Sequence, residues 1–208
     1  MHLILASASP RRAEILRNAG FKIEIRPVSI DESLCPGEPA TDYVRRLAEE
    51  KARAVARQLK SETMPEPTFI IGADTAVVGE GEILGKPTSK EDARRMLRIL
   101  SGKKHEVFTG LAVLPLSNRQ IFVSAEATCV TFARLSDDEI EDYVSTGEPF
   151  DKAGGYGIQG RGGKFISRIE GCYFNVMGMP LARLYAMLRE LSADSREKLV
   201  PRTEKGGK

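Results

Sequence analysis

The sequence predicts an α/β protein with a mixed, twisted sheet and flanking helices. Two observations lead to this prediction. Helical and strand patterns alternate in the first half of the chain, which favours strands joined by helices. In the second half, the apolar segments 107–116 and 121–132 follow each other closely and predict an antiparallel hairpin. A purely parallel sheet is therefore disfavoured.

The first half begins with a short buried strand at residues 3–5. A helix from Pro10 to Ala19 follows, with Ser9 as N-cap and Gly20 as its stop signal. Next come a strand at 22–26, a loop at 27–39, a long helix at 41–60, and two strands within 69–84 joined by a Gly-Glu-Gly turn. The long helix has an apolar face that consists of Val44, Leu47, Ala48, Val55 and Leu59.

The second half contains two predicted capping boxes. Ser89 to Asp92 opens a helix that ends at Gly102, and Ser136 to Glu139 opens one that ends at Gly147. A glycine-dense loop, 151–163, precedes two short predicted strands, 165–169 and 173–176. A last helix begins at Pro180, and its predicted buried residues are Leu181, Leu184, Tyr185, Leu188 and Leu191. We expect one domain over residues 1–192 and a disordered polar tail over 193–208.

Composition excludes several classes of protein. The chain has 31 basic and 29 acidic residues; five basic and three acidic ones lie in the tail, which leaves a balanced body. A nucleic-acid polymer is therefore a poor partner. No apolar run approaches a membrane span, so we expect no membrane association. The three separated cysteines fit neither a metal pattern nor a disulfide framework, which favours the cytoplasm.

The N-terminal segment resembles an anion site. The hydroxyls of Ser7 and Ser9, the guanidiniums of Arg11 and Arg12 and the positive end of a helix converge just beyond a strand. This arrangement predicts a phosphate or polyphosphate ligand. The alternative is that Ser9 only caps the helix and that both arginines are solvated.

Three charged residues stand in unusual surroundings. Asp74 interrupts an apolar strand, where an unpaired carboxylate would be costly. An Asx-type turn beside Gly72 is the alternative to a functional role. Lys51 falls on the buried side of its helix, where snorkelling is the alternative. Lys86 stands between a glycine and a proline, but the surrounding sequence does not fit a Walker A loop, so side-chain cations would have to hold a phosphate.

Several ordered motifs together carry a family resemblance. They are LASASPRRAEIL, IDES, the Lys51-Ala52 step, IIGADTAVV, LGKP, HEVFTG, GEPFDKAGGYGIQG and GCYFNVMGMPL. The chain resembles the Maf family of nucleoside triphosphate pyrophosphatases from about residue 3 to residue 191. Arg12, Thr75 and Gln159 are similar to the branch that acts on dTTP and UTP.

The resemblance implies an elongated fold with a deep cleft between two lobes, often as a homodimer. It implies hydrolysis of a nucleoside triphosphate to the monophosphate and pyrophosphate, with Mg²⁺ or Mn²⁺ as cofactor. Asp74 corresponds to the catalytic proton acceptor, while Glu32, Lys51 and Lys86 belong to the polar cleft. Phosphoryl chemistry itself needs carboxylates for a metal, here Glu32 and Asp74, and cations for the polyphosphate. Asp74 thus either binds the metal or accepts the proton of the attacking water.

The residues that choose the base can also be argued from hydrogen-bonding capacity. The Gln159 amide matches uracil or thymine, but if flipped it would match cytosine. Arg12 carries donors only and would oppose the cytosine amino group. Two other functions stay open at this point: a non-catalytic nucleotide-binding regulator linked to cell division, and an interaction module that uses the basic tail.

Overall fold

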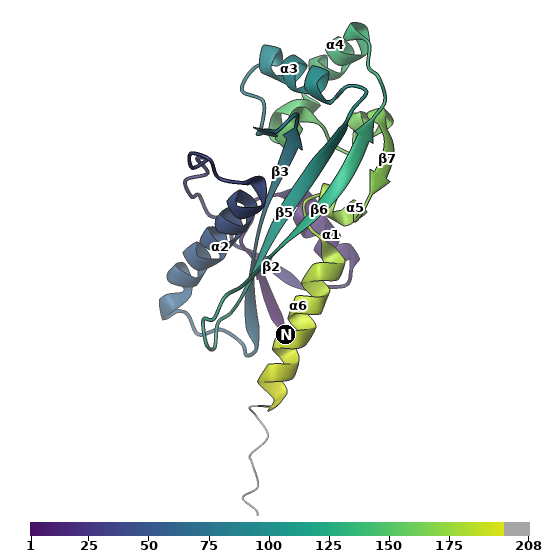
Figure 1. Ribbon diagram of the computed structural model, residues 1–208. Helices are drawn as coiled ribbons and strands as arrows, with labels where there is room; N and C mark the ends of the chain where they lie inside the picture. Colours follow the sequence, from purple (N-terminus) through teal and green to yellow (C-terminus); the bar gives the residue numbers. More distant parts are fainter. Residues whose placement is uncertain (198–208) are drawn as a thin grey trace, which may run out of the picture.

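The computed structural model describes residues 1–197, with side chains through residue 192. Within these residues the strands form one seven-stranded sheet in the order β2-β1-β3-β5-β6-β7, with β4 paired to β3 (Figure 1). The strands are β1 His2–Leu5, β2 Ile23–Ile25, β3 Thr68–Gly79, β4 Glu82–Leu84, β5 Lys104–Pro115, β6 Phe122–Phe132 and β7 Ile166–Glu170. β1 runs parallel to β2 and β3, and the other pairs are antiparallel, which confirms the mixed sheet.

Helices cover both faces and one end of this elongated sheet. They are α1 Pro10–Asn18, α2 Ala40–Gln58, α3 Lys90–Leu100, α4 Asp137–Ser145, α5 Tyr173–Val176 and α6 Leu181–Glu197. Short 3₁₀ turns connect them: η1 Leu59–Ser61, η2 Glu148–Asp151, η3 Ala153–Gly155 and η4 Arg161–Phe165. In Figure 1, α2 lies on one side of the sheet, α1 and α6 lie on the other, and α3 and α4 stand at its far end.

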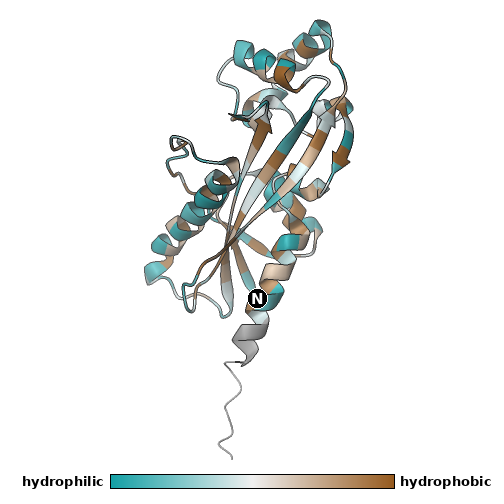
Figure 2. Cartoon of the chain, viewed as in Figure 1, coloured by the Kyte–Doolittle hydropathy of each residue, from teal (hydrophilic) through white to brown (hydrophobic). Residues whose placement is uncertain are grey.

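The core divides in the same way. Successive residues of a strand point to opposite faces, so Ile70 packs with the residues of α2, while Phe69 and Ile71 pack with α1 and α6. A third apolar cluster joins the far end of β3 and β5 to α3 and α4. Figure 2 shows the apolar colour along the strands and the polar colour on much of α2. No helix in residues 1–197 combines the length and apolarity that crossing a bilayer requires.

Two glycines let α2 lie directly against the sheet. A Cβ at Gly72 of β3 would overlap the carbonyl of Ala48, and one at Gly110 of β5 would overlap the carbonyl of Val44. Asp74 lies two residues after Gly72 and therefore on the same face of β3. This close approach places one turn of α2, which includes Lys51, beside Asp74.

Most predicted elements are confirmed, with ends shifted by a few residues. The Ser136 capping box is complete, because Ser136 Oγ accepts from Glu139 N–H and the Glu139 carboxylate accepts from Ser136 N–H. The Ser89 box is only half formed. Ser89 Oγ accepts from Asp92 N–H, but the Asp92 carboxylate accepts from Thr88 N–H.

Three predictions near the C-terminus are wrong. Residues 173–176 form a helical turn, α5, because buried Asn175 donates to Val107 O and Thr128 Oγ1 and so folds the segment onto the sheet. Tyr185 is 55% exposed, since it lies beside the apolar stripe of α6. Helix α6 continues to Glu197, so the first residues of the predicted tail are helical. The rest of the tail, 198–208, lies outside the described residues.

Candidate functional site

The predicted site residues meet in one cleft. Its volume is about 820 Å³, and its walls come from the end of β1, from α1, α2, β3 and β4, and from the glycine-dense loop. Every residue that the sequence predicts for the site lines this cleft: Ser7, Ser9, Arg11, Arg12, Glu32, Lys51, Asp74, Thr75, Lys86 and Gln159.

A lysine between two carboxylates forms the charged centre of the cleft. Lys51 Nζ lies 2.6 Å from Asp74 Oδ1 and 2.6 Å from Glu32 Oε1. Lys51 and Asp74 are 7% and 8% exposed, whereas Glu32 is more open to solvent. Tyr43 OH donates to the backbone carbonyl of Glu32 and ties its loop to α2. Lys51 therefore does not snorkel to the surface; its buried ammonium pairs with the buried Asp74 and with the more exposed Glu32.

The electrostatic surroundings keep Glu32 ionised. Burial raises the pKa of Glu32, but the hydrogen bond and charge of Lys51, together with the charges of Lys86 and Arg12, outweigh it. The pKa of Glu32 consequently lies below its usual value. An ionised carboxylate is thus open to solvent on this side of the cleft at neutral pH.

The donor set suits a divalent ion that arrives with its ligand. No group of three or more metal-binding side chains occurs in the part of the chain that the structure describes. Mg²⁺, however, commonly binds through one or two carboxylates and completes its shell with water and substrate phosphates. The pair of Glu32 and Asp74 fits such an ion, whose charge would oppose that of a polyphosphate.

Arg12 is fixed in the floor of the cleft. Its guanidinium donates to Gly178 O at 2.8 Å, to Ser7 Oγ at 3.1 Å and to Thr75 Oγ1 at 3.0 Å. Burial lowers the pKa of Arg12, and the charge of Asp74 partly offsets this effect. Arg12 is not solvated, which excludes that alternative for this residue. Its three bonds instead hold β3, the end of β1 and the turn after α5 together.

The hydroxyl groups of Ser7 and Ser9 differ in their hydrogen bonds. Ser7 Oγ accepts from Arg12 and also from the N–H of Ser9. Ser9 stands at the N-cap of α1, but its side chain forms no capping hydrogen bond. The structure therefore contradicts the alternative in which the Ser9 side chain only caps the helix.

The remaining predicted residues lie at the edges of the cleft. Lys86 and Gln159 are exposed, and Lys86 is near enough to Glu32 to lower its pKa. Gly154 N–H donates to Gly85 O, which joins the glycine-dense loop to the segment that carries Lys86. Arg11 donates to Asp151 Oδ2 at 3.1 Å and so pairs with the opposite wall.

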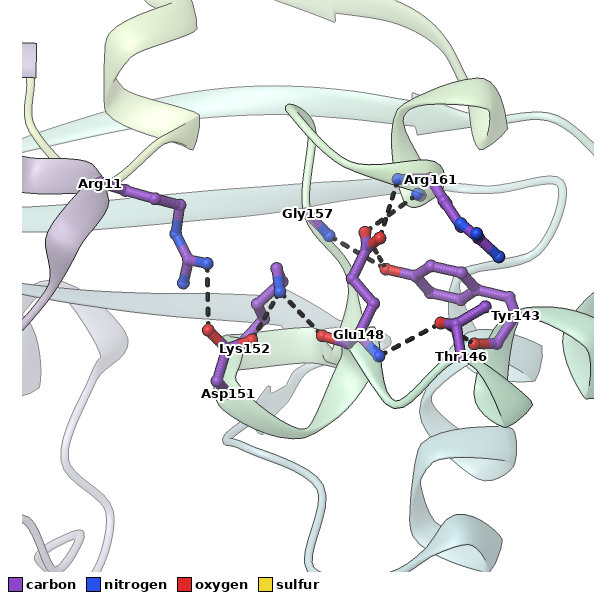
Figure 3. A network of polar contacts seen from close by, with 9 residues as sticks. Arg11, Tyr143, Thr146, Glu148, Asp151, Lys152, Gly157 and Arg161 are labelled. Atoms are coloured by element: carbon purple, nitrogen blue, oxygen red, sulfur yellow. Dashed lines mark hydrogen bonds and ion pairs between the residues drawn. The ribbon is translucent and has the colours of Figure 1, made fainter. Parts of the chain in front are cut away.

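A polar network next to the glycine-dense loop was missed by the prediction. The Glu148 carboxylate accepts from Tyr143 OH, Arg161 N–H and Gly162 N–H, which closes the loop (Figure 3). Lys152 Nζ donates to Asp151 Oδ1 and to Glu148 O. The only sequence signal was a group of charged residues just before the glycines, a pattern that also occurs on many surfaces.

Comparison with known proteins finds one family model and several relatives that match most of the chain. A family model described as Maf-like protein matches residues 2–191. A Koribacter versatilis protein named dTTP/UTP pyrophosphatase is 50% identical over 91% of this chain and 94% of its own length. A protein of the same name from Anaeromyxobacter dehalogenans is 51% identical over 90% of this chain and 92% of its own length. Another, from Geobacter sp. strain M21, is 48% identical over 92% of this chain and 96% of its own length. Among solved structures, "The structure of the Staphylococcus aureus Ham1 protein" is similar with a TM-score of 0.43 and 12% identity over 64% of this chain and 72% of that chain.

Proposed function

The chain belongs to the Maf family, and from this membership we propose that it hydrolyses dTTP and UTP to the nucleoside monophosphate and pyrophosphate. Relatives that match over nearly their whole length bear the name of this activity. The observation that carries the proposal is the Lys51 ammonium 2.6 Å from both Glu32 and Asp74, in a cleft that Arg11, Arg12 and Lys86 also line.

The side chains of the cleft have two roles in the proposed reaction, charge neutralisation and proton transfer. Arg11, Lys51 and Lys86 oppose the negative charge of the triphosphate, which increases at the leaving pyrophosphate during cleavage. Asp74 accepts the proton of the water that attacks the α-phosphate. Its carboxylate is buried next to a fixed cation, so it is oriented before the substrate arrives.

A divalent ion, Mg²⁺ or Mn²⁺, would be held by Glu32 and Asp74 and would supply further charge neutralisation. Ser7 and Ser9 would donate hydroxyl hydrogen bonds to phosphate oxygens at the N-terminal end of α1. The Ser9 hydroxyl suits this role because helix capping does not use it.

Base selection is assigned to Gln159 with support from Arg12 and Thr75. Gln159 is exposed on the cleft and can pair with the imide edge of uracil or thymine. Arg12 uses three of its N–H donors in hydrogen bonds within the protein, and one of these bonds fixes Thr75. Gln159 pairs with the base but does not by itself distinguish uracil from cytosine, so Arg12, which carries donors only and fixes Thr75, completes the selection.

A nucleotide panel tests the proposal. Pyrophosphate release is measured with dTTP, UTP, CTP, dATP and GTP in the presence of Mg²⁺ or Mn²⁺, and again with EDTA. We expect turnover of dTTP and UTP well above that of the other nucleotides, and loss of turnover with EDTA. Binding without turnover of any nucleotide would instead support a regulator that only senses triphosphates.

Assembly and location are part of the same proposal. As the family resemblance implies, the protein acts as a homodimer, and the free thiols of Cys35, Cys129 and Cys172 agree with a cytoplasmic site of action. Sedimentation velocity on the full chain and fractionation of cells test these two statements.

A further inference from the structure

One exposed carboxylate connects two cations from opposite walls of the cleft. Asp151 Oδ2 accepts from Arg11 at 3.1 Å, and Asp151 Oδ1 accepts from Lys152 at 2.5 Å (Figure 3). Arg11 belongs to the first turn of α1, whereas Asp151 and Lys152 lie at the end of η2. All three residues line the cleft, so the contact spans it.

The two cations are held more firmly than the carboxylate between them. The Lys152 side chain is 13% exposed, that of Arg11 is 30% exposed, and that of Asp151 is 63% exposed. Lys152 Nζ also donates to Glu148 O at 2.8 Å. A Cβ at Gly157 would lie 2.6 Å from Lys152 Cε, so the loop backbone confines the lysine stem. Lys152 is therefore positioned by the fold, while Asp151 has room to turn away.

Asp151 is charged in the free protein. Burial raises its pKa, but the hydrogen bond from Lys152 and the charges of Arg11 and Lys152 lower it further, so the pKa lies below its usual value. An ion pair this open to water contributes little to stability. An anion with more charge than one carboxylate can consequently replace Asp151 at small cost.

From these contacts we propose that Arg11 and Lys152 form a phosphate subsite, and that Asp151 is its internal anionic occupant until a polyphosphate displaces it. The carboxylate has two oxygens, one toward each cation, as two oxygens of a phosphate would have. The inference rests on the proposed function and adds Lys152 to its binding residues. It also makes Asp151 a competitor of the substrate, which favours release of the pyrophosphate product.

The test uses inorganic tripolyphosphate as the probe and isothermal titration calorimetry as the readout. The full chain is titrated at low ionic strength with EDTA present, so that neither turnover nor metal contributes. Asp151→Asn should bind tripolyphosphate at least about threefold more tightly than the unmodified protein, since the competing charge is gone. Lys152→Met should bind it at least about threefold more weakly, and Lys152→Arg should retain most of the affinity.

A combined variant separates displacement from simple charge repulsion. If Asp151 competes for Lys152, the gain from Asp151→Asn shrinks to less than half in the Lys152→Met background. If Asp151 only repels anions from a distance, the gain stays the same and the proposal is overturned. Absence of tripolyphosphate binding to both the unmodified protein and Asp151→Asn overturns it as well.

The control is a carboxylate that holds two cations outside the cleft. Glu170 Oε1 lies 3.2 Å from Lys104 Nζ and 3.1 Å from Arg168 Nε. Glu170→Gln should leave the tripolyphosphate affinity unchanged, and a gain equal to that of Asp151→Asn would contradict a local subsite. These titrations need no hydrolysis, so failure of the nucleotide panel and failure of this inference give different results.

Discussion

Lys51 Nζ lies 2.6 Å from Asp74 Oδ1, although both residues belong to elements that are otherwise apolar where they meet. Leaving either charge alone at this depth would be costly. The pair therefore explains how α2 and β3 each tolerate a charged residue. Glu32 provides a second carboxylate for the same ammonium, and its greater exposure opens the pair to the cleft.

Replacement of Asp74 by asparagine tests its role as the proton acceptor. Asp74→Asn keeps the size of the side chain but removes its basicity, so we expect turnover of dTTP to fall by at least about 100-fold. Glu32 still neutralises Lys51 in this variant, so nucleotide binding should be largely retained. Pyrophosphate release and calorimetry with a non-hydrolysable dTTP analogue measure the two effects. A variant that remains active would refute the assignment.

Substitution of Gln159 tests base selection. Gln159→Ala removes an exposed amide from the cleft, so it should lower the ratio of UTP to CTP hydrolysis with little effect on folding. The ratio of kcat/KM values for the two nucleotides is the measurement. Equal losses on both nucleotides would show that Gln159 serves binding in general.

Arg12 requires a different experiment because it is buried. Arg12→Lys cannot form the three bonds to Ser7, Thr75 and Gly178, so a change in selectivity must be compared with a change in stability. We expect this variant to lose thermal stability as well as discrimination between UTP and CTP. A loss of stability with unchanged discrimination would assign Arg12 to folding alone.

The sequence predicts which charged residues meet in the cleft because these residues conflict with their local surroundings. Lys51 falls on the apolar face of a helix, and Asp74 falls in an apolar strand; each position is costly unless a partner exists. Asp151 and Lys152 offer no such conflict, since they are polar residues beside a polar loop. Their role depends on Arg11, which lies 140 positions away along the chain.

Tertiary contacts also explain the errors of the prediction. Residues 173–176 combine aromatic residues and a valine, which favours a strand. The three groups that hydrogen-bond to Asn175 come from β5, which supplies Val107 O and Thr109 Oγ1, and from β6, which supplies Thr128 Oγ1. No local pattern in the sequence indicates these distant partners. The bonds of Arg12 to Thr75 and Gly178 are equally distant in the sequence.

The contact between α2 and the sheet depends on the absence of a side chain at Gly72. In Gly72→Ala the new methyl group would overlap the Ala48 carbonyl, which is backbone and cannot turn aside. We expect the free energy of unfolding to fall by about 2–3 kcal/mol, and activity to fall because α2 carries Lys51. Urea denaturation measures the first effect.

The control for this prediction is Gly85→Ala, since nothing lies within 4 Å of a Cβ at that position. The free energy of unfolding of Gly85→Ala should stay close to that of the unmodified protein. Equal stability of the two variants would show that α2 can move away from the sheet without loss.

Acid sensitivity should depend on His105, which is buried in β5. Its Nε2 lies 2.7 Å from Tyr156 OH, and burial lowers its pKa from 6.5 to about 4. Between these values the unfolded chain binds a proton that the folded chain does not, so stability decreases as pH falls from 6.5 toward 4. From pH 7 to pH 5, His105 lowers the free energy of unfolding by about 2 kcal/mol. His105→Gln puts an amide, which does not titrate, in place of the imidazole near Tyr156. In urea denaturation at the two pH values, the unmodified protein should therefore lose about 2 kcal/mol more than His105→Gln. Equal losses would show that other groups cause the acid sensitivity.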